Sequence, residues 1–440
     1  MTRREAGAVL GVLGILIAIT VPELGSDGWA FYPPSVERHG IPGLLVRAAG
    51  DEWDQNPGIL RAFAMIGGVL TALAALVVLK AQTVRPILVT SLCAGVIVLV
   101  AVPATLLQVG LRDGTAPWYF DNDSTYQIDL AGELVLDGHT PYGHDYRGSG
   151  LEKWYPAVNA DEDVPRVALD HFAYFPGTAL TAAAWRLLPA PYDDYRMFVL
   201  LCTLALFVVA LLFDAPLPWK LAAGVALAAN PLATRAAWFG TADAPSVLLT
   251  VLAFLFVTRA RYVLAAASLA GAILLKQFAL VALPFLLVAM LVRAVPRRTL
   301  YQAGAGFVIV LAAGILPFAI ADPGALWEDT IAYGAETYRI IGYGLAGILV
   351  ELKILDDRFG YYPFLPLALL VWLPITAFLA WTQWRSRRLW LSAAGFAVSI
   401  FVLLYLARVF QNSYLIWPLS ALLIAFVLAS SEPDDASAPG

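Results

Sequence analysis

The chain has 440 residues, enough for two or three soluble domains, but 60% of them are hydrophobic and only 14% are charged, which does not suit a surface that faces water. Acidic residues outnumber basic ones by 33 to 28, and the net charge of −5 excludes the basic footprint of a nucleic-acid-binding protein. Both cysteines, Cys93 and Cys202, lie in apolar stretches, which excludes a disulfide framework or a cysteine-based metal site. The composition indicates a protein that crosses a membrane several times.

Twelve apolar stretches approach the ~20 residues that a helix needs to cross a bilayer. The first follows Arg3 and Arg4 and looks like a signal peptide, but no small-residue cleavage site comes before Glu23, so we expect a retained anchor. The predicted fold is therefore an all-α polytopic membrane protein. Its helices are expected at residues 7–22, 59–79, 86–108, 197–213, 219–235, 245–259, 262–276, 277–294, 300–320, 363–381, 389–407 and 412–429.

Basic residues in the short connections predict the orientation, because they stay on the cytoplasmic side during insertion. One arrangement places every basic cluster inside and makes both termini cytoplasmic. It requires residues 174–189 to lie on the outer leaflet or dip into it rather than cross the membrane. The arginine-rich composition is typical of bacteria with GC-rich genomes, so we expect a bacterial inner membrane. The clusters are Arg3 and Arg4, Lys80 and Arg85, Lys220, Arg259 and Arg261, Arg293, Arg297 and Arg298, and Arg385, Arg387 and Arg388.

Three long segments then face outward, at residues 23–58, 109–196 and 321–362. The second is rich in Asp and Glu, and a loop of this length in a compact protein usually has a function. We expect an N-terminal transmembrane hairpin at 1–80, a main module at 81–429 that includes the outer loops 109–196 and 321–362, and a disordered cytoplasmic tail at 430–440.

The spacing of apolar residues predicts a surface helix at 124–137 in the second outer segment. We expect it to lie flat on the membrane, with a capping box made by Ser124 and Gln127 at its start. Tyr126, Leu130 and Leu134 form its apolar stripe, and Asp129, Glu133 and Asp137 are predicted to form a solvated face.

Three acids are candidates for catalysis. Asp121 and Asp123 lie at the positive end of the predicted surface helix, where Asp123 is either a first-turn helix acid or a carboxylate held at the bilayer surface as a general base. Asp243 lies in a short outer turn before Pro245, where it is either the N-cap of the next helix or a functional acid.

Lys276 and Gln277 interrupt the apolar run 265–292 near the outer end of two abutting helices. Ionisable residues within spans are costly and mark substrate or ion sites, although a lysine near an interface can also extend its ammonium to the surface.

Other polar residues near the outer ends are Arg339, Arg408, Gln411 and Asn412. An arginine fork matches phosphate, although arginines at such positions are often structural. The four histidines lie in outer loops at spacings that match no metal site, so we predict that they are solvated; they are His39, His139, His144 and His171.

A series of short motifs resembles one family. The run Asp123-Ser-Thr-Tyr126, with Ala131, Leu134, Gly138 and Pro141-Tyr142 after it, resembles the first outer loop of polyprenyl-phosphate-sugar-dependent glycosyltransferases of the GT-C fold, especially the bacterial mannosyltransferase branch. Further matches follow in the family's order across residues 86 to 429. They are Tyr174-Phe-Pro176, Asn230-Pro231 with Gly240-Thr-Ala-Asp243, Ala270-Gly271 with Lys276-Gln277, Ala321-Asp-Pro323, and Gln411-Asn412-Ser-Tyr414 with Trp417-Pro418.

The chain departs from the family pattern in two places. The acidic loop follows the third predicted helix rather than the first, so residues 1–80 look like an added hairpin, and residues 143–170 look like an insertion. The family's catalytic acid falls on Asp121 or Asp123, of which we favour Asp123.

The resemblance implies an inverting transfer of a sugar, mannose by preference, from a polyprenyl phosphate to a lipid or cell-envelope glycan on the outer face. Such a transfer requires no nucleotide pocket and is compatible with a divalent metal. Asp123 would be the base, and Asp243 would orient the acceptor or hold the metal. Lys276, Gln277, Arg339 and Arg408 would bind the donor phosphate, and Tyr126, Tyr142, Gln411 and Asn412 would bind the sugar or acceptor.

A transporter or lipid flippase is the alternative, since it would also have many spans and buried ionisable residues. Transporters commonly show internal repeats and charges at the membrane midplane. Here no repeat is visible and the candidate residues gather near outer ends, which favours surface chemistry.

Overall fold

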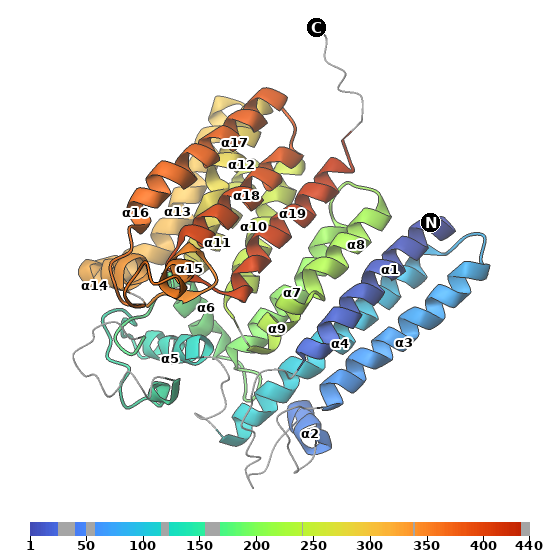
Figure 1. Ribbon diagram of the computed structural model, residues 1–440, viewed down its shortest axis with the longest axis horizontal. Coiled ribbons are helices and arrows are strands. Elements are labelled where there is room, and N and C mark those ends of the chain that lie inside the picture. The colour runs from blue at the N-terminus through green and yellow to red at the C-terminus, as the bar shows by residue number, and fades with distance from the viewer. Residues whose placement is uncertain are drawn as a thin grey trace.

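The computed structural model describes residues 1–24, 40–49, 58–115, 123–154, 168–239, 241–337 and 339–432. Helices dominate these residues (Figure 1). The strands β1 (Ile341–Gly342) and β2 (Val409–Phe410) form a small parallel pair. The chain is therefore an all-α membrane protein, as predicted, with a short β-ladder that the sequence pattern did not predict.

Within the described residues, six helical stretches are long and apolar enough to cross a membrane: Arg3–Glu23, Gly58–Lys80, Pro86–Gly110, Arg297–Ala321, Phe364–Ser386 and Asn412–Ala429. Six shorter apolar helices are Tyr195–Leu211, Leu217–Ala228, Asp243–Thr258, Tyr262–Leu275, Gln277–Val292 and Trp390–Leu406. Each coincides with one of the predicted stretches, which confirms the membrane character. The number of crossings stays a prediction.

The N-terminal part contains α1 (Arg3–Thr20), η1 (Val21–Glu23), α2 (Gly40–Ala49), α3 (Gly58–Lys80) and α4 (Pro86–Thr115). A capping box between Thr2 and Glu5 starts α1. Buried residues of α1, α3 and α4 share one apolar cluster with Leu221 and Val225 of α8 (Leu217–Ala228). The hairpin at 1–80 is thus packed against the main module through a continuous core.

The middle of the chain carries α5 (Asp123–Leu136), η2 (Leu151–Trp154), α6 (Pro176–Trp185), α7 (Tyr195–Leu211), α9 (Pro231–Phe239), α10 (Asp243–Thr258), α11 (Tyr262–Leu275), η3 (Gln277–Ala282) and α12 (Leu283–Val292). The ten residues of α6 rise only ~15 Å, half of the bilayer's hydrocarbon core. A helix of this length does not cross a bilayer alone, and the position of the stretch at the surface stays a prediction.

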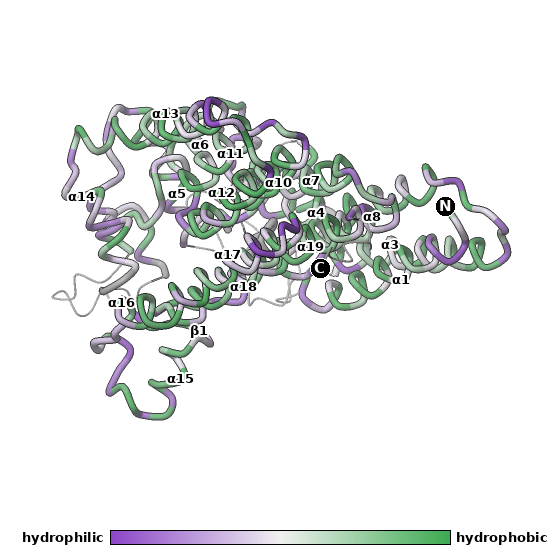
Figure 2. The backbone as a smooth tube through the Cα atoms, turned by 90° about the horizontal axis from the view of Figure 1, so that it is seen from above, coloured by the Kyte–Doolittle hydropathy of each residue, from purple (hydrophilic) through white to green (hydrophobic). Residues whose placement is uncertain are grey.

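The C-terminal part contains α13 (Arg297–Ala321), α14 (Pro323–Trp327), η4 (Glu328–Thr337), α15 (Leu345–Glu351), α16 (Phe364–Leu367), η5 (Ala368–Trp372), α17 (Leu373–Ser386), α18 (Trp390–Leu406), η6 (Asn412–Leu415) and α19 (Ile416–Ala429). Large apolar side chains on α3 and α13 are exposed, such as Val77 at 68% and Ile320 at 79%. Hydrophobic residues run along these helices and hydrophilic ones gather at the turns (Figure 2). This is the surface expected of helices that face lipid.

The predicted cytoplasmic connections gather at one end of the bundle. Arg259 donates to the carbonyl of Leu212, and Arg293 Nη1 donates to that of Val257 at 3.0 Å. The N-terminus and the end of α19 also lie at this end in Figure 1, opposite α5, α6, α14 and α15. The contacts agree with the arrangement that the basic residues predicted, while the side of the membrane stays a prediction.

One predicted span, 219–235, is interrupted. The chain leaves the helix at Ala229, and Asn230 Oδ1 accepts a hydrogen bond from the Ala233 N–H at 2.9 Å at the start of α9. Pro231 fits the first position of that helix because its missing N–H would have no partner there. The stretch therefore forms two helices, α8 and α9.

Candidate functional site

The centre of the candidate site is a buried ion pair between Asp243 and Lys276. Lys276 Nζ lies 2.7 Å from Asp243 Oδ1, and the two residues are 8% and 1% exposed. Trp417 Nε1 donates to the same oxygen at 2.7 Å. Asp243 Oδ2 is buried and has no hydrogen-bond partner among the described residues. These contacts bring together residues of three predicted motifs that are far apart in the sequence.

Local structure explains the positions of both charges. Asp243 is the first residue of α10, where the helix dipole stabilises a carboxylate. Lys276 has an extended backbone, with φ −153° and ψ 124°, and separates α11 from η3. The break in the helix lets the Lys276 side chain reach the start of α10.

Aromatic rings surround the ammonium group of Lys276. Its Nζ lies 5.0 Å from the ring centroid of Phe278 and 5.1 Å from that of Tyr414. Phe278 also packs edge-on against Tyr414 and Trp417. Rings at these distances stabilise a cation and exclude water, so electrostatic interactions are stronger here than at a solvated surface.

The ion pair lies short of the end of α13. Gly314 of α13 lies against Leu274, whose side chain would be 2.7 Å from an added Cβ. α13 continues for seven residues beyond that level, to Ala321, which corresponds to ~10 Å. Lys276 follows Leu274 by two residues, so the buried pair lies several residues short of the level at which α13 ends.

The start of α6 lies directly against the end of α11. Thr178 Oγ1 donates to the carbonyl of Leu275, the last residue of α11, at 2.6 Å. Gly177 approaches the same turn so closely that a Cβ would be 2.7 Å from the Leu274 carbonyl oxygen. The predicted juxtamembrane helix therefore contacts the segment that ends at Lys276.

The predicted base, Asp123, is the first residue of α5 and is half-buried, and its Oδ1 accepts the Ser124 N–H at 2.7 Å. Asp121 lies outside the described residues. The predicted capping box is wrong, because Gln127 is buried and its Nε2 donates to the carbonyls of Ala168 at 2.6 Å and His171 at 2.8 Å. Gln127 thereby joins α5 to the segment around His171.

The acidic face predicted for this helix is also partly wrong. Asp129 is 3% exposed, and its Oδ2 lies 3.1 Å from Arg186 Nη1 at the end of α6. Arg186 also pairs with Glu133, which is exposed as predicted, as is Asp137. Buried acids are rare without a partner, and the partner here comes from the next helix.

Tyr126 and Tyr142 are buried in an apolar cluster that also contains Ala242 and Ala244, the two neighbours of Asp243. Their hydroxyls donate to the carbonyls of Ser149 and Tyr174. Burial, with smaller contributions from Tyr146 and the Asp329 charge, raises the pKa of Tyr142 well above 10. Both tyrosines thus connect the segment 109–196 to the start of α10. Their role in sugar binding stays a prediction.

The β-ladder joins the two segments that carry the predicted phosphate-binding arginines. Ile341 pairs with Val409, so Arg339 and Arg408 precede neighbouring parallel strands. Arg408 is 2% exposed and its Nη1 donates to the Gly360 carbonyl at 3.2 Å, whereas Arg339 is exposed.

The remaining predicted polar residues are Gln277, Gln411 and Asn412. Gln277 begins η3 and is half-buried. Gln411 and Asn412 are exposed at the start of η6, which leads to Tyr414 and then to Trp417 on α19.

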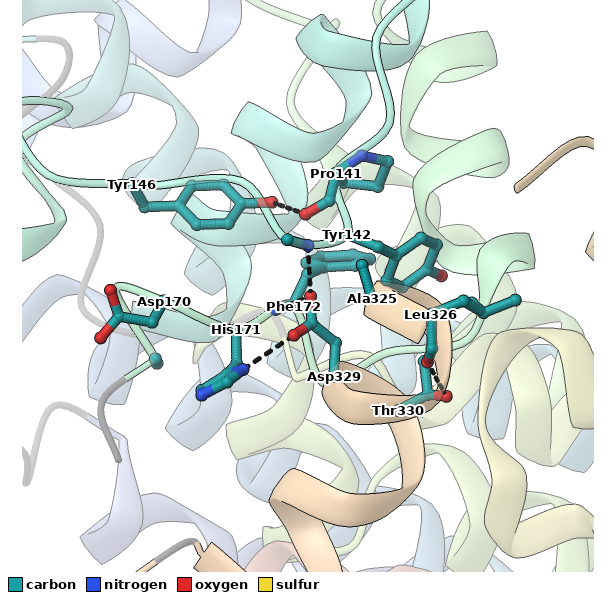
Figure 3. Close-up of polar contacts among 12 residues, drawn as sticks. Pro141, Tyr142, Tyr146, Asp170, His171, Phe172, Ala325, Leu326, Asp329 and Thr330 are labelled. Carbon is teal, nitrogen blue, oxygen red and sulfur yellow. Dashed lines mark hydrogen bonds and ion pairs between the residues drawn. The ribbon is translucent and has the colours of Figure 1, made fainter. Parts of the chain in front are cut away.

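A second buried cluster, centred on Asp329, was not found from the sequence (Figure 3). Asp329 Oδ1 lies 2.7 Å from His171 Nδ1, and Oδ2 accepts the N–H groups of Gly143 at 2.9 Å and Phe172 at 3.2 Å. His171 is 9% exposed, so its predicted solvation is wrong. The only sequence signal was the placement of both residues in outer segments, since 158 positions separate them.

Among the described residues, no group of three or more His, Cys, Asp or Glu side chains is placed to hold a metal ion. Comparisons of the chain with protein-family models, with curated proteins and with solved structures found no match.

Proposed function

We propose that the protein is a membrane glycosyltransferase that moves a sugar, mannose by preference, from a polyprenyl phosphate to a lipid or glycan acceptor. The observation that carries the proposal is the contact of Asp243, Lys276 and Trp417, which come from three of the motifs that resemble the GT-C family. Chance similarity of short motifs gives no reason for them to meet in space.

The proposed reaction needs one base and a stabilised leaving group. Asp123 takes the proton of an acceptor hydroxyl while that oxygen attacks the anomeric carbon. The bond from this carbon to the phosphate oxygen breaks, and polyprenyl phosphate leaves with the electron pair. Attack from the face opposite the leaving group inverts the anomeric configuration.

Lys276 is assigned to the leaving phosphate. An ammonium has three N–H donors, so the contact with Asp243 leaves donors for a phosphate oxygen. Such an interaction is strong in a site from which aromatic rings exclude water. Gln277, Arg339 and Arg408 are assigned to the same phosphate.

The remaining residues are assigned to the sugar and the acceptor. Asp243 Oδ2, which has no partner among the described residues, is suited to accept a hydrogen bond from a hydroxyl group. Tyr126, Tyr142, Gln411 and Asn412 are assigned to the same ligands.

The test is transfer of labelled mannose from polyprenyl-phosphate mannose by the purified protein, with a lipid extract as acceptor. Asp123→Asn and Asp121→Asn are compared with Asp137→Asn, an exposed acid just after α5 that serves as the matched control. We expect Asp123→Asn to abolish transfer and Asp137→Asn to leave it unchanged. Normal transfer by Asp123→Asn would refute the assignment of the base, and loss in Asp121→Asn alone would move it to Asp121.

A transporter or flippase is the second candidate, and the buried Asp243–Lys276 pair is the observation that favours it, since such pairs occur along ion and substrate paths. The two candidates differ in product. Flux of polyprenyl-phosphate sugar across proteoliposomes, with no new glycosidic bond formed from any such donor, would replace the transferase proposal.

A further inference from the structure

The cluster around Asp329 joins two segments that the topology prediction places outside. Asp329 lies on η4, is 2% exposed, and receives hydrogen bonds from Gly143 and Phe172 as well as its contact with His171. Burial of a carboxylate is strongly unfavourable unless its oxygens accept hydrogen bonds. The donors all come from the stretch before α6, so separating the two segments would leave this carboxylate unsatisfied.

The ring of His171 is contacted on its edge and on its face by one helix. Its Nδ1 meets Asp329, and the ring stacks on Tyr333, with centroids 4.3 Å apart and an interplanar angle of 28°.

Gly143, with φ +68°, lies so close to α14 that an added Cβ would be 2.9 Å from the Ala325 Cβ. Figure 3 shows Asp329 pointing toward His171 and the backbone beside Tyr142.

The same histidine is bonded to α5. The His171 carbonyl accepts the Gln127 side-chain N–H at 2.8 Å. Gln127 follows Asp123 by four residues, and residues at this spacing lie on one face of a helix. Asp329 therefore contacts the side chain of His171, and the backbone carbonyl of the same residue is bonded to the face of α5 that carries Asp123.

We propose that Asp329 and His171 are positioning residues for the base Asp123, so that the segment after α13 sets the reactivity of the acid on α5. The inference rests on the proposed function. Neither residue is assigned to the donor phosphate, which lies with Lys276. Loss of the contact therefore lowers kcat while the donor KM stays near its normal value, because a misplacement of about 1 Å at a reacting group can cost ~100-fold in rate.

The test compares Asp329→Ala with Asp329→Asn. The asparagine oxygen can still accept the N–H groups of Gly143 and Phe172, and its amide can donate to His171 Nδ1 in the other neutral tautomer. The matched control is Thr330→Val, because Thr330 is buried on the same helix as Asp329 but its hydroxyl donates to the Leu326 carbonyl of the preceding α14 and not to the stretch before α6.

We expect Asp329→Ala to lower kcat by ~10- to 100-fold with the donor KM within about twofold, Asp329→Asn to recover most of the rate, and Thr330→Val to match the wild type. Equal loss in the Ala and Asn variants, or a change confined to KM, overturns the positioning role. Hydrogen exchange supplies a readout that needs no activity. Amides of α5 should exchange faster in Asp329→Ala than in Thr330→Val. Equal exchange in the two variants overturns the inference, whatever the activity of the wild type. Failure of the wild type to transfer sugar would refute only the proposed function.

Discussion

Removing one partner of the Asp243–Lys276 pair should destabilise the protein far more than removing both. Lys276→Met leaves a carboxylate inside the bundle with its charge unbalanced, since Asp243 is 1% exposed. Loss of one partner of a buried pair costs about 3–5 kcal/mol, whereas replacement of both by uncharged groups is often close to neutral. We therefore expect Lys276→Met and Asp243→Asn each to lose about 3–5 kcal/mol and the double variant to lose clearly less than their sum.

The assay is the free energy of unfolding in mixed detergent micelles, measured for the two single variants and the double variant. Glu351→Gln is the matched control, because Glu351 and Arg358 also form a pair at 3.1 Å, but their side chains are 75% and 52% exposed. Exposed pairs contribute ~0–1 kcal/mol. The double variant should also fold without transferring sugar, which separates stability from phosphate binding.

Two results would refute this reasoning. A loss for Lys276→Met as small as that for Glu351→Gln would mean that water reaches the pair. A double variant that loses the full sum of the single variants would mean that the two charges do not interact.

Two further predictions concern close packing and pH. Gly177→Ala should lower the free energy of unfolding by about 1–3 kcal/mol, because its Cβ would be 2.7 Å from the Leu274 carbonyl oxygen. Gly7→Ala is the control and should be neutral or stabilising, because nothing lies within 4 Å of the added Cβ. Equal melting temperatures of the two variants would contradict this prediction. Stability should fall as pH rises above about 10, because the unfolded chain loses the Tyr142 proton there while burial keeps the folded phenol protonated. Tyr142→Phe should flatten this dependence in unfolding experiments from pH 9 to 11, and an unchanged slope would count against it.

Hydropathy predicted the helices well because a bilayer requires long apolar stretches and little else. It failed at Asn230, inside a predicted span, where the chain breaks. The signal was present, since an asparagine followed by proline is a common helix start, but the apolar residues on both sides concealed it.

The site was predicted in part, and the limits follow from distance along the chain. Lys276 and Asp243 stood out because each is charged near apolar residues, although nothing local indicated that they pair with each other. Asp129 and His171 were predicted to be solvated because local periodicity gives no information on a partner such as Arg186 or Asp329 far along the chain. Burial of a charge depends on that partner.

The neutrality of the Asp243–Lys276 pair also has an electrical consequence. A charge that crosses the whole membrane changes its energy by about 2.3 kcal/mol per 100 mV, but opposite charges 2.7 Å apart experience almost the same potential and their contributions cancel. The membrane potential therefore exerts almost no net force on the pair. Lys276→Met would leave a net negative charge at this position and Asp243→Asn a net positive one. The membrane potential would therefore change the energies of the two variants in opposite directions.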